Sequence, residues 1–85
     1  MTLQELRKQI DAIDDEIVAL LEKRLQIAKQ IGELKTRLNV EVYHPQREEE
    51  ILKRLQSISS LSPHQIEEIY KSIFTLTKVL QEENL

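Results

Sequence analysis

An unbroken apolar stripe along the first 38 residues constrains the fold more than any other feature of the sequence. Apolar residues recur there at alternating steps of three and four, the a/d spacing of a helix that packs along one face. Thr2 and Glu5 match a capping box, and nothing stops the helix before Asn39, which is suited to a left-handed helix end. We therefore predict one long helix over about residues 2–38. The stripe consists of Leu3, Leu6, Ile10, Ile13, Ile17, Leu20, Ile27, Ile31, Leu34 and Leu38.

Two shorter helices are predicted after the long one. Pro45 is suited to the first position of a helix, which its apolar pattern extends over about residues 45–58. Ser62 and Gln65 form a second capping box, which predicts a helix over about residues 63–83. The predicted order is therefore a long, a short and a medium helix.

No part of the chain predicts a β-sheet. The segment 39–44 alternates apolar and polar residues like a strand, but it has no partner strand and is predicted to be a loop. One Gly and two Pro are too few for the turns of a sandwich or barrel, so the predicted class is all-α. The single glycine, Gly32, lies inside the long helix, where a close helix contact explains it better than a hinge.

The predicted long helix does not fit inside a compact monomer. A helix of about 37 residues is roughly 55 Å long at 1.5 Å per residue. A compact single domain of 85 residues has a diameter of about 30 Å. The stripe stays apolar over the whole length, and the two shorter helices cannot cover it. We therefore predict that residues 1–85 form one domain that assembles as an intertwined antiparallel homodimer.

Composition excludes several classes of function. The net charge of −3 argues against nucleic acid as the main partner. The absence of cysteine excludes a disulfide framework, a zinc finger and a thiol nucleophile. No apolar run approaches a membrane span, and the first ten residues lack the core of a signal peptide. We therefore predict a cytoplasmic protein with no membrane partner.

Several polar residues lie where the apolar pattern does not need them. Arg24 occupies an a position of the long helix, where an apolar residue is expected. The others lie beside apolar faces: Arg7 and Lys35 on the long helix, Arg47 and Glu48 on the second, Thr77 and Gln81 on the third.

Each of these residues could also have a purely structural role. Arg24 could set the register of a coiled coil, and Arg7 and Lys35 could be edge residues with exposed charges. Arg47 and Glu48 could form an ion pair near the helix dipole, and the polar residues of the third helix could simply face solvent. Their convergence favours a ligand, because buried cations need a counter-ion. A negatively charged small molecule would supply it.

Arg7 and Lys35 cannot share a site within one chain. They are 28 positions apart, which is roughly 42 Å along a helix. If two copies of the long helix pack antiparallel about residue 20 or 21, Arg7 of one copy faces positions 33–35 of the other. Each dimer would then have two composite sites. Two arginines and a lysine suit a small dicarboxylate, because a guanidinium binds a carboxylate through two parallel hydrogen bonds.

The ordered set of motifs resembles the all-helical chorismate mutases, the AroQ class. The resemblance begins with LRKQIDAIDDEIVALLEKR, continues through IGELK and HPQREEEILKRL, and ends at TKVLQ, so it covers nearly the whole chain. Each piece alone is weak, whereas the set with these spacings is specific. The resemblance implies an enzyme that converts chorismate to prephenate in phenylalanine and tyrosine biosynthesis.

The resemblance also implies a role for each cation of the set. Arg7, from the partner chain, and Arg24 would hold the two carboxylates of chorismate. Lys35 would contact a carboxylate and the ether oxygen of the breaking bond. Arg47 would support the cluster from the second helix.

The remaining implied roles concern uncharged groups and one carboxylate. Gln81 would donate to the ether oxygen, and Glu48 would accept from the ring hydroxyl. Thr77 stands where the family often has Ser, and it keeps the hydroxyl near a substrate carboxylate. His44 stands where the best-known bacterial relative has Asp, so its contact would be through the backbone or the side chain, or it could be only an exposed neighbour of the helix cap.

The implied reaction is a one-substrate [3,3] rearrangement, which needs no metal and no cofactor. The sequence agrees, since it has no clustered His pair and no Gly-rich phosphate loop. Two other functions stay open. One is an isochorismate pyruvate-lyase with the same cationic pocket, and the other is a non-catalytic regulatory or dimerisation module of a shikimate-pathway enzyme.

Overall fold

Three helices account for the secondary structure of the residues described, 1–41 and 44–82, in a computed structural model. They are α1 (Leu3–Leu38), α2 (Pro45–Ile58) and α3 (Pro63–Glu82). No strand occurs in those residues, which confirms the predicted all-α class. The strand-like segment 39–44 includes Val42 and Tyr43, which lie outside the described residues, so the predicted loop is described only at its two ends.

The two ends of α1 are capped as the sequence predicts. The side chain of Thr2 accepts a hydrogen bond from the backbone N–H of Glu5 at 3.1 Å, and the Glu5 carboxylate accepts one from the N–H of Thr2 at 3.2 Å. At the other end Asn39 adopts a left-handed conformation with φ 57° and ψ 42°. Its N–H donates to the carbonyl of Thr36 at 3.2 Å, which satisfies one of the last carbonyls of the helix.

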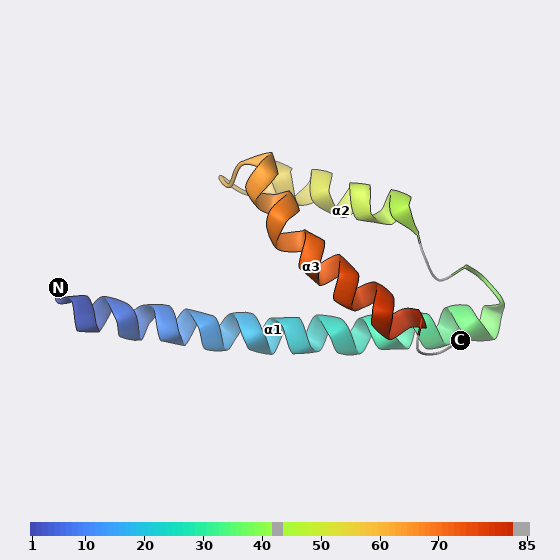
Figure 1. The fold of residues 1–85 in the computed structure, drawn as a ribbon, viewed down its shortest axis with the longest axis horizontal. Coiled ribbons are helices and arrows are strands. Elements are labelled where there is room, and N and C mark those ends of the chain that lie inside the picture. Colours follow the sequence, from blue (N-terminus) through green and yellow to red (C-terminus); the bar gives the residue numbers. More distant parts are fainter. Residues whose placement is uncertain (42–43, 83–85) are drawn as a thin grey trace.

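The molecule is elongated because α1 is longer than the rest of the fold (Figure 1). Its principal extents are 55 × 23 × 16 Å, and its radius of gyration is 16.0 Å. A compact chain of this length would have a radius of gyration near 12 Å. The first turns of α1 project beyond α2 and α3 (Figure 1).

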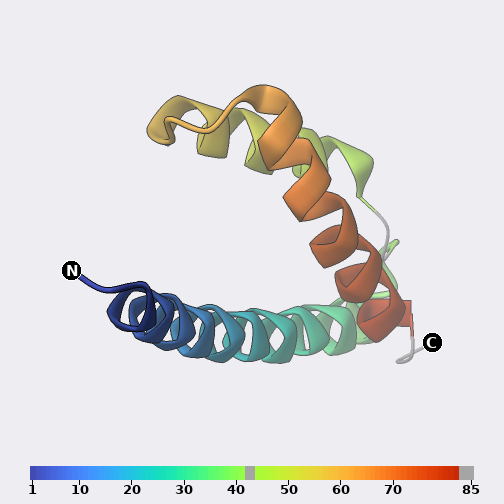
Figure 2. The same cartoon turned by 60° about the vertical axis from the view of Figure 1, so that its left-hand side comes forward.

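Helix α3 connects the other two. It packs on both α1 and α2, whereas α1 and α2 make no direct backbone contact in the described part of the chain. Figure 2 shows the resulting open arrangement, with α1 and α2 on opposite sides and α3 joining them at one end. The space between α1 and α2 is thus walled by three helices.

The two buried residues of α1 are both small, and α3 is the helix that packs on α1 in the described part of the chain. Ala28 and Gly32 lie one turn apart on α1 and are both buried. Gly32 has no positive φ, and α1 continues through it without a break. A small-residue pair of this kind lets a second helix approach closely, which is the role predicted for Gly32.

A single chain buries little apolar surface. The only apolar side chains among the described residues that count as buried are Ala28, Ile51 and Ile66. All ten members of the α1 stripe are exposed, with exposed fractions between 42% and 65%. A stripe of this size on a free surface marks an interaction face. No helix in the described ranges is both long and apolar enough to cross a membrane.

Candidate active site

A cavity of about 490 Å³ lies between the three helices. It is lined by side chains of all three and by the residue that precedes α2. Seven of the eight site residues predicted from the sequence line this cavity: Arg24, Lys35, His44, Arg47, Glu48, Thr77 and Gln81. Residues up to 57 positions apart in the chain, from 24 to 81, therefore meet in one place.

Arg24 is held in position from α3. Its Nη1 donates to the hydroxyl of Thr77 at 2.8 Å, and that hydroxyl in turn donates to the carbonyl of Ile73 at 2.8 Å. The Arg24 guanidinium also lies over the ring of Tyr70, 5.8 Å from its centroid. The polar residue at the a position thus faces α3 of its own chain.

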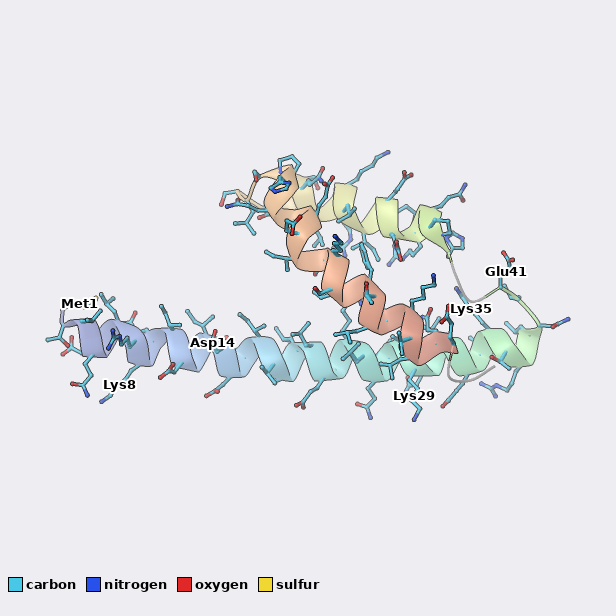
Figure 3. The ribbon with its side chains drawn as sticks, in the orientation of Figure 1. Met1, Lys8, Asp14, Lys29, Lys35 and Glu41 are labelled. Atoms are coloured by element: carbon cyan, nitrogen blue, oxygen red, sulfur yellow. The ribbon has the colours of Figure 1, made fainter. Side chains whose placement is uncertain are left out.

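Lys35 and Gln81 line the cavity from α1 and α3. Gln81 lies in the last turn of α3 and is only 9% exposed, which is unusual for a glutamine. Lys35 lies in the last turn of α1 and is half-buried. Figure 3 shows Lys35 on the side of α1 that faces α3, whereas Lys29 points to the opposite side. A cation and a neutral amide donor therefore line the same cavity.

His44 is both a helix cap and part of the cavity wall. Its Nδ1 accepts a hydrogen bond from the backbone N–H of Arg47 at 3.0 Å, so the imidazole is the N-cap of α2. The side chain is exposed. The predicted alternatives for His44, cap residue and site residue, are therefore compatible with each other.

The two charged site residues of α2 have different surroundings. Glu48 lies in the first turn and is half-buried. The Nη1 of Arg47 lies 3.4 Å from a carboxylate oxygen of Glu50, and both side chains are well exposed. The ion pair considered between Arg47 and Glu48 is therefore wrong. Arg47 pairs instead with Glu50, which lies three positions further along the helix and so on the same face.

Arg7 lies outside the cavity. It is exposed in the second turn of α1, and the cavity residues of that helix start only at Arg24. One chain therefore brings together every predicted site residue except the one that was assigned to a second copy.

Five further residues line the cavity without having been predicted as site residues. They are Ile31, Glu50, Ile51, Phe74 and Lys78. The signal for two of them is helical spacing, since Phe74, Thr77, Lys78 and Gln81 lie at steps that place them on one face of α3. The apolar ones provide a wall against which a hydrocarbon ring can pack.

The cavity carries an excess of positive charge in a chain whose net charge is −3. Four cations line it, and two carboxylates offset them. In the described part of the chain no group of three or more His, Cys, Asp or Glu side chains is placed to hold a metal ion. The fold and the cavity thus define an all-helical protein with a half-open cavity in which cations outnumber carboxylates.

Comparison with known proteins assigns the family. The family model for chorismate mutase type II matches residues 6–82. The chorismate mutase of Methanocaldococcus jannaschii is 32% identical over 88 residues, which cover 98% of this chain and 87% of that protein. The chain belongs to the chorismate mutase type II family, as its resemblance to the AroQ class implies.

A longer relative and one solved structure are chorismate mutases by name, and a second solved structure has the same fold. The bifunctional chorismate mutase/prephenate dehydratase of Aquifex aeolicus is 40% identical over 72 residues, 85% of this chain but only 18% of that protein. The structure of chorismate mutase (form II) from Thermus thermophilus has a TM-score of 0.88 and 35% identity, covering 94% of this chain and 93% of that one. A conserved hypothetical protein from Pyrococcus furiosus has a TM-score of 0.80 and 41% identity, covering 95% and 96%.

Proposed function

We propose that residues 1–85 form a chorismate mutase domain that converts chorismate to prephenate. The observation that carries this proposal is the cavity itself, in which seven of the eight residues implied by the family resemblance converge from three helices and the N-cap of α2. Membership in the chorismate mutase type II family supports it independently.

The reaction needs restraint and electrostatics rather than a reactive side chain. In a [3,3] rearrangement the ether C–O bond breaks while a C–C bond forms in the same molecule, so the enolpyruvyl group moves within the substrate and no proton or second reactant is needed. An enzyme has to hold the enolpyruvyl arm over the ring, which removes rotational freedom before the reaction. It also has to stabilise the negative charge that develops on the ether oxygen.

Arg24 is suited to hold a substrate carboxylate. The hydrogen bond to Thr77 and the ring of Tyr70 restrict its guanidinium before any ligand arrives. A donor that is already ordered loses less conformational entropy on binding. Thr77 supports the same carboxylate either directly or through Arg24.

Lys35 and Gln81 are suited to the ether oxygen. Both are donors that line the cavity, and Gln81 is buried. A hydrogen bond to a developing charge is stronger in a water-poor site than in solvent. Glu48 is suited to accept from the ring hydroxyl, with His44 and Arg47 adjoining it at the start of α2.

The exposed stripe of α1 supports an antiparallel homodimer. Its apolar residues run along the full helix and are exposed in one chain. A second copy of α1, antiparallel about residue 20 or 21, would cover the stripe and bring its Arg7 to the end of the cavity near Lys35. The second copy thus supplies the substrate-binding cation that one chain lacks.

The location and further partners of the chain stay predictions. We expect it in the cytoplasm. One relative is by name a mutase and a prephenate dehydratase in one protein. An association of this chain with an enzyme of aromatic amino acid biosynthesis is consistent with that fusion.

Purified protein is expected to consume chorismate and to release prephenate. Loss of chorismate absorbance measures the turnover, and chromatography identifies the product. Release of salicylate from isochorismate would indicate a pyruvate-lyase instead. A dimer without turnover on either isomer would indicate a regulatory module.

The neutral amide of Gln81 predicts activity that is independent of pH across the neutral range. An amide donates without first being protonated. A Gln81→Glu variant is expected to be active only at low pH, because a carboxylate that has lost its proton can no longer donate to the ether oxygen. Profiles of kcat from pH 5 to 7.5 compare the two. A steep fall of wild-type activity over that range would contradict the role of Gln81.

A further inference from the structure

Lys78 is a cation of the cavity to which the proposed function assigns no role. It follows Thr77 directly and precedes Gln81 by three positions, so it lies on the face of α3 that lines the cavity. Unlike the buried Gln81, Lys78 is exposed. It is therefore a lysine on the solvent side of the cavity wall.

A second hollow, on the surface, shares part of its lining with the main cavity, so the shared residues form the rim of that cavity. A space of about 270 Å³ on the surface is lined by Glu48, Phe74 and Lys78, which also line the main cavity. Its other lining residues, Lys71 and Thr75, do not line the main cavity. Lys78 thus borders both the main cavity and the open surface.

Because the chain is negatively charged overall, a cation at the cavity rim would help to attract a dianionic substrate. The chain carries a net charge of −3, which repels a dianion at long range. The lining of the main cavity carries four cations, Lys78 among them, against two carboxylates. An exposed lysine at the rim adds local positive potential where an entering dianion passes.

We propose that Lys78 is a substrate-capture residue, whose ammonium attracts a carboxylate of the dianionic substrate at the rim and contacts it during entry. This inference rests on the proposed function for the identity of the substrate. The flexible, hydrated ammonium of a lysine favours capture over fixed orientation. A rim charge acts on association and its salt dependence, whereas ordered interior donors act on the chemical step.

The test compares Lys78→Gln with Lys71→Gln. Both lysines are exposed on α3, and both substitutions change the net charge equally, but only Lys78 lines the main cavity. At low ionic strength Lys78→Gln is expected to lower kcat/KM about two- to fivefold with kcat unchanged. The Lys71→Gln control is expected to lower kcat/KM less than Lys78→Gln does, because Lys71 borders only the surface hollow. The difference is expected to disappear at about 0.5 M salt, where charges are screened within a few ångström.

A third variant separates the loss of charge from a loss of folded structure. Lys78→Arg, which keeps the charge, is expected to retain wild-type kcat/KM, so a loss in Lys78→Gln alone is not attributable to damaged folding. Equal kcat/KM for Lys78→Gln and Lys71→Gln would overturn the proposal, as would a loss in kcat at unchanged KM.

Failure of the mutase proposal can be distinguished from failure of the Lys78 proposal. If the wild-type protein binds chorismate in calorimetry but does not convert it, the mutase proposal fails. The dissociation constant of chorismate then tests Lys78, and a weaker affinity for Lys78→Gln than for Lys71→Gln supports capture. Equal affinities overturn it.

Discussion

Replacing Lys35 with alanine is expected to abolish measurable turnover while leaving the assembly intact. Lys35 is half-buried at the inner part of the cavity and is proposed to donate to the ether oxygen. Loss of one donor to a developing negative charge costs about 10²–10³ in kcat. The expected loss is at least of this size, because Lys35 also carries a full charge and is proposed to contact a carboxylate. Steady-state kinetics with chorismate measure it.

The matched control for this variant is Lys29→Ala. Lys29 is on the same helix and is exposed, and it points away from α3 (Figure 3). It is expected to keep wild-type kcat. Light scattering and circular dichroism are expected to show the same mass and helicity for both variants. Turnover near the wild-type rate in Lys35→Ala would remove Lys35 from the mechanism.

The helices of this chain could be predicted because their signals are local. The capping box of Thr2 and Glu5 and the left-handed Asn39 involve neighbours within one turn, and the structure has both. The length of α1 follows from the length of the stripe. The burial of Gly32 could be predicted because a glycine lowers helix stability, and a close contact with a second helix offsets that loss.

The site could be predicted only in part, because its outer residues depend on how α2 and α3 pack. Polar residues on or beside the apolar faces indicated Arg24 and Gln81, and both line the cavity. Phe74 and Lys78 fit the helical pattern of α3 as ordinary core and surface residues, so only the packing of α3 against α2 reveals them. The ion pair of Arg47 with Glu50 could have been predicted from helical spacing, because side chains three positions apart face each other on a helix and adjacent ones do not.

In a single chain the apolar face of α1 is uncovered, and the set of site residues lacks Arg7. The α1 stripe is exposed, and Arg7 lies on the part of α1 that α3 does not reach. A second copy that covered the stripe in antiparallel orientation would also bring its Arg7 to the cavity, because both follow from the same packing of the two α1 helices. Stability and catalysis would then depend on a single interface.

An Arg7→Ala chain mixed with a Lys35→Ala chain is expected to regain activity that neither variant has alone. In the mixed dimer one site receives Lys35 from the first chain and Arg7 from the second, so it is complete. The other site lacks both residues. Random pairing of equal amounts gives half mixed dimers with one working site of two, which is about a quarter of wild-type activity.

The control places both substitutions in one chain and mixes it with wild type. If the sites are shared, each site of the mixed dimer lacks one residue, and only wild-type dimers work, again about a quarter of full activity. If each site belongs to one chain, the mixed dimer keeps one working site, and the total is about half. Exchange of subunits by unfolding and refolding, followed by kinetics with chorismate, separates the two models. No recovery for the single-variant mixture, together with half activity for the control, would show that Arg7 acts within its own chain or not at all.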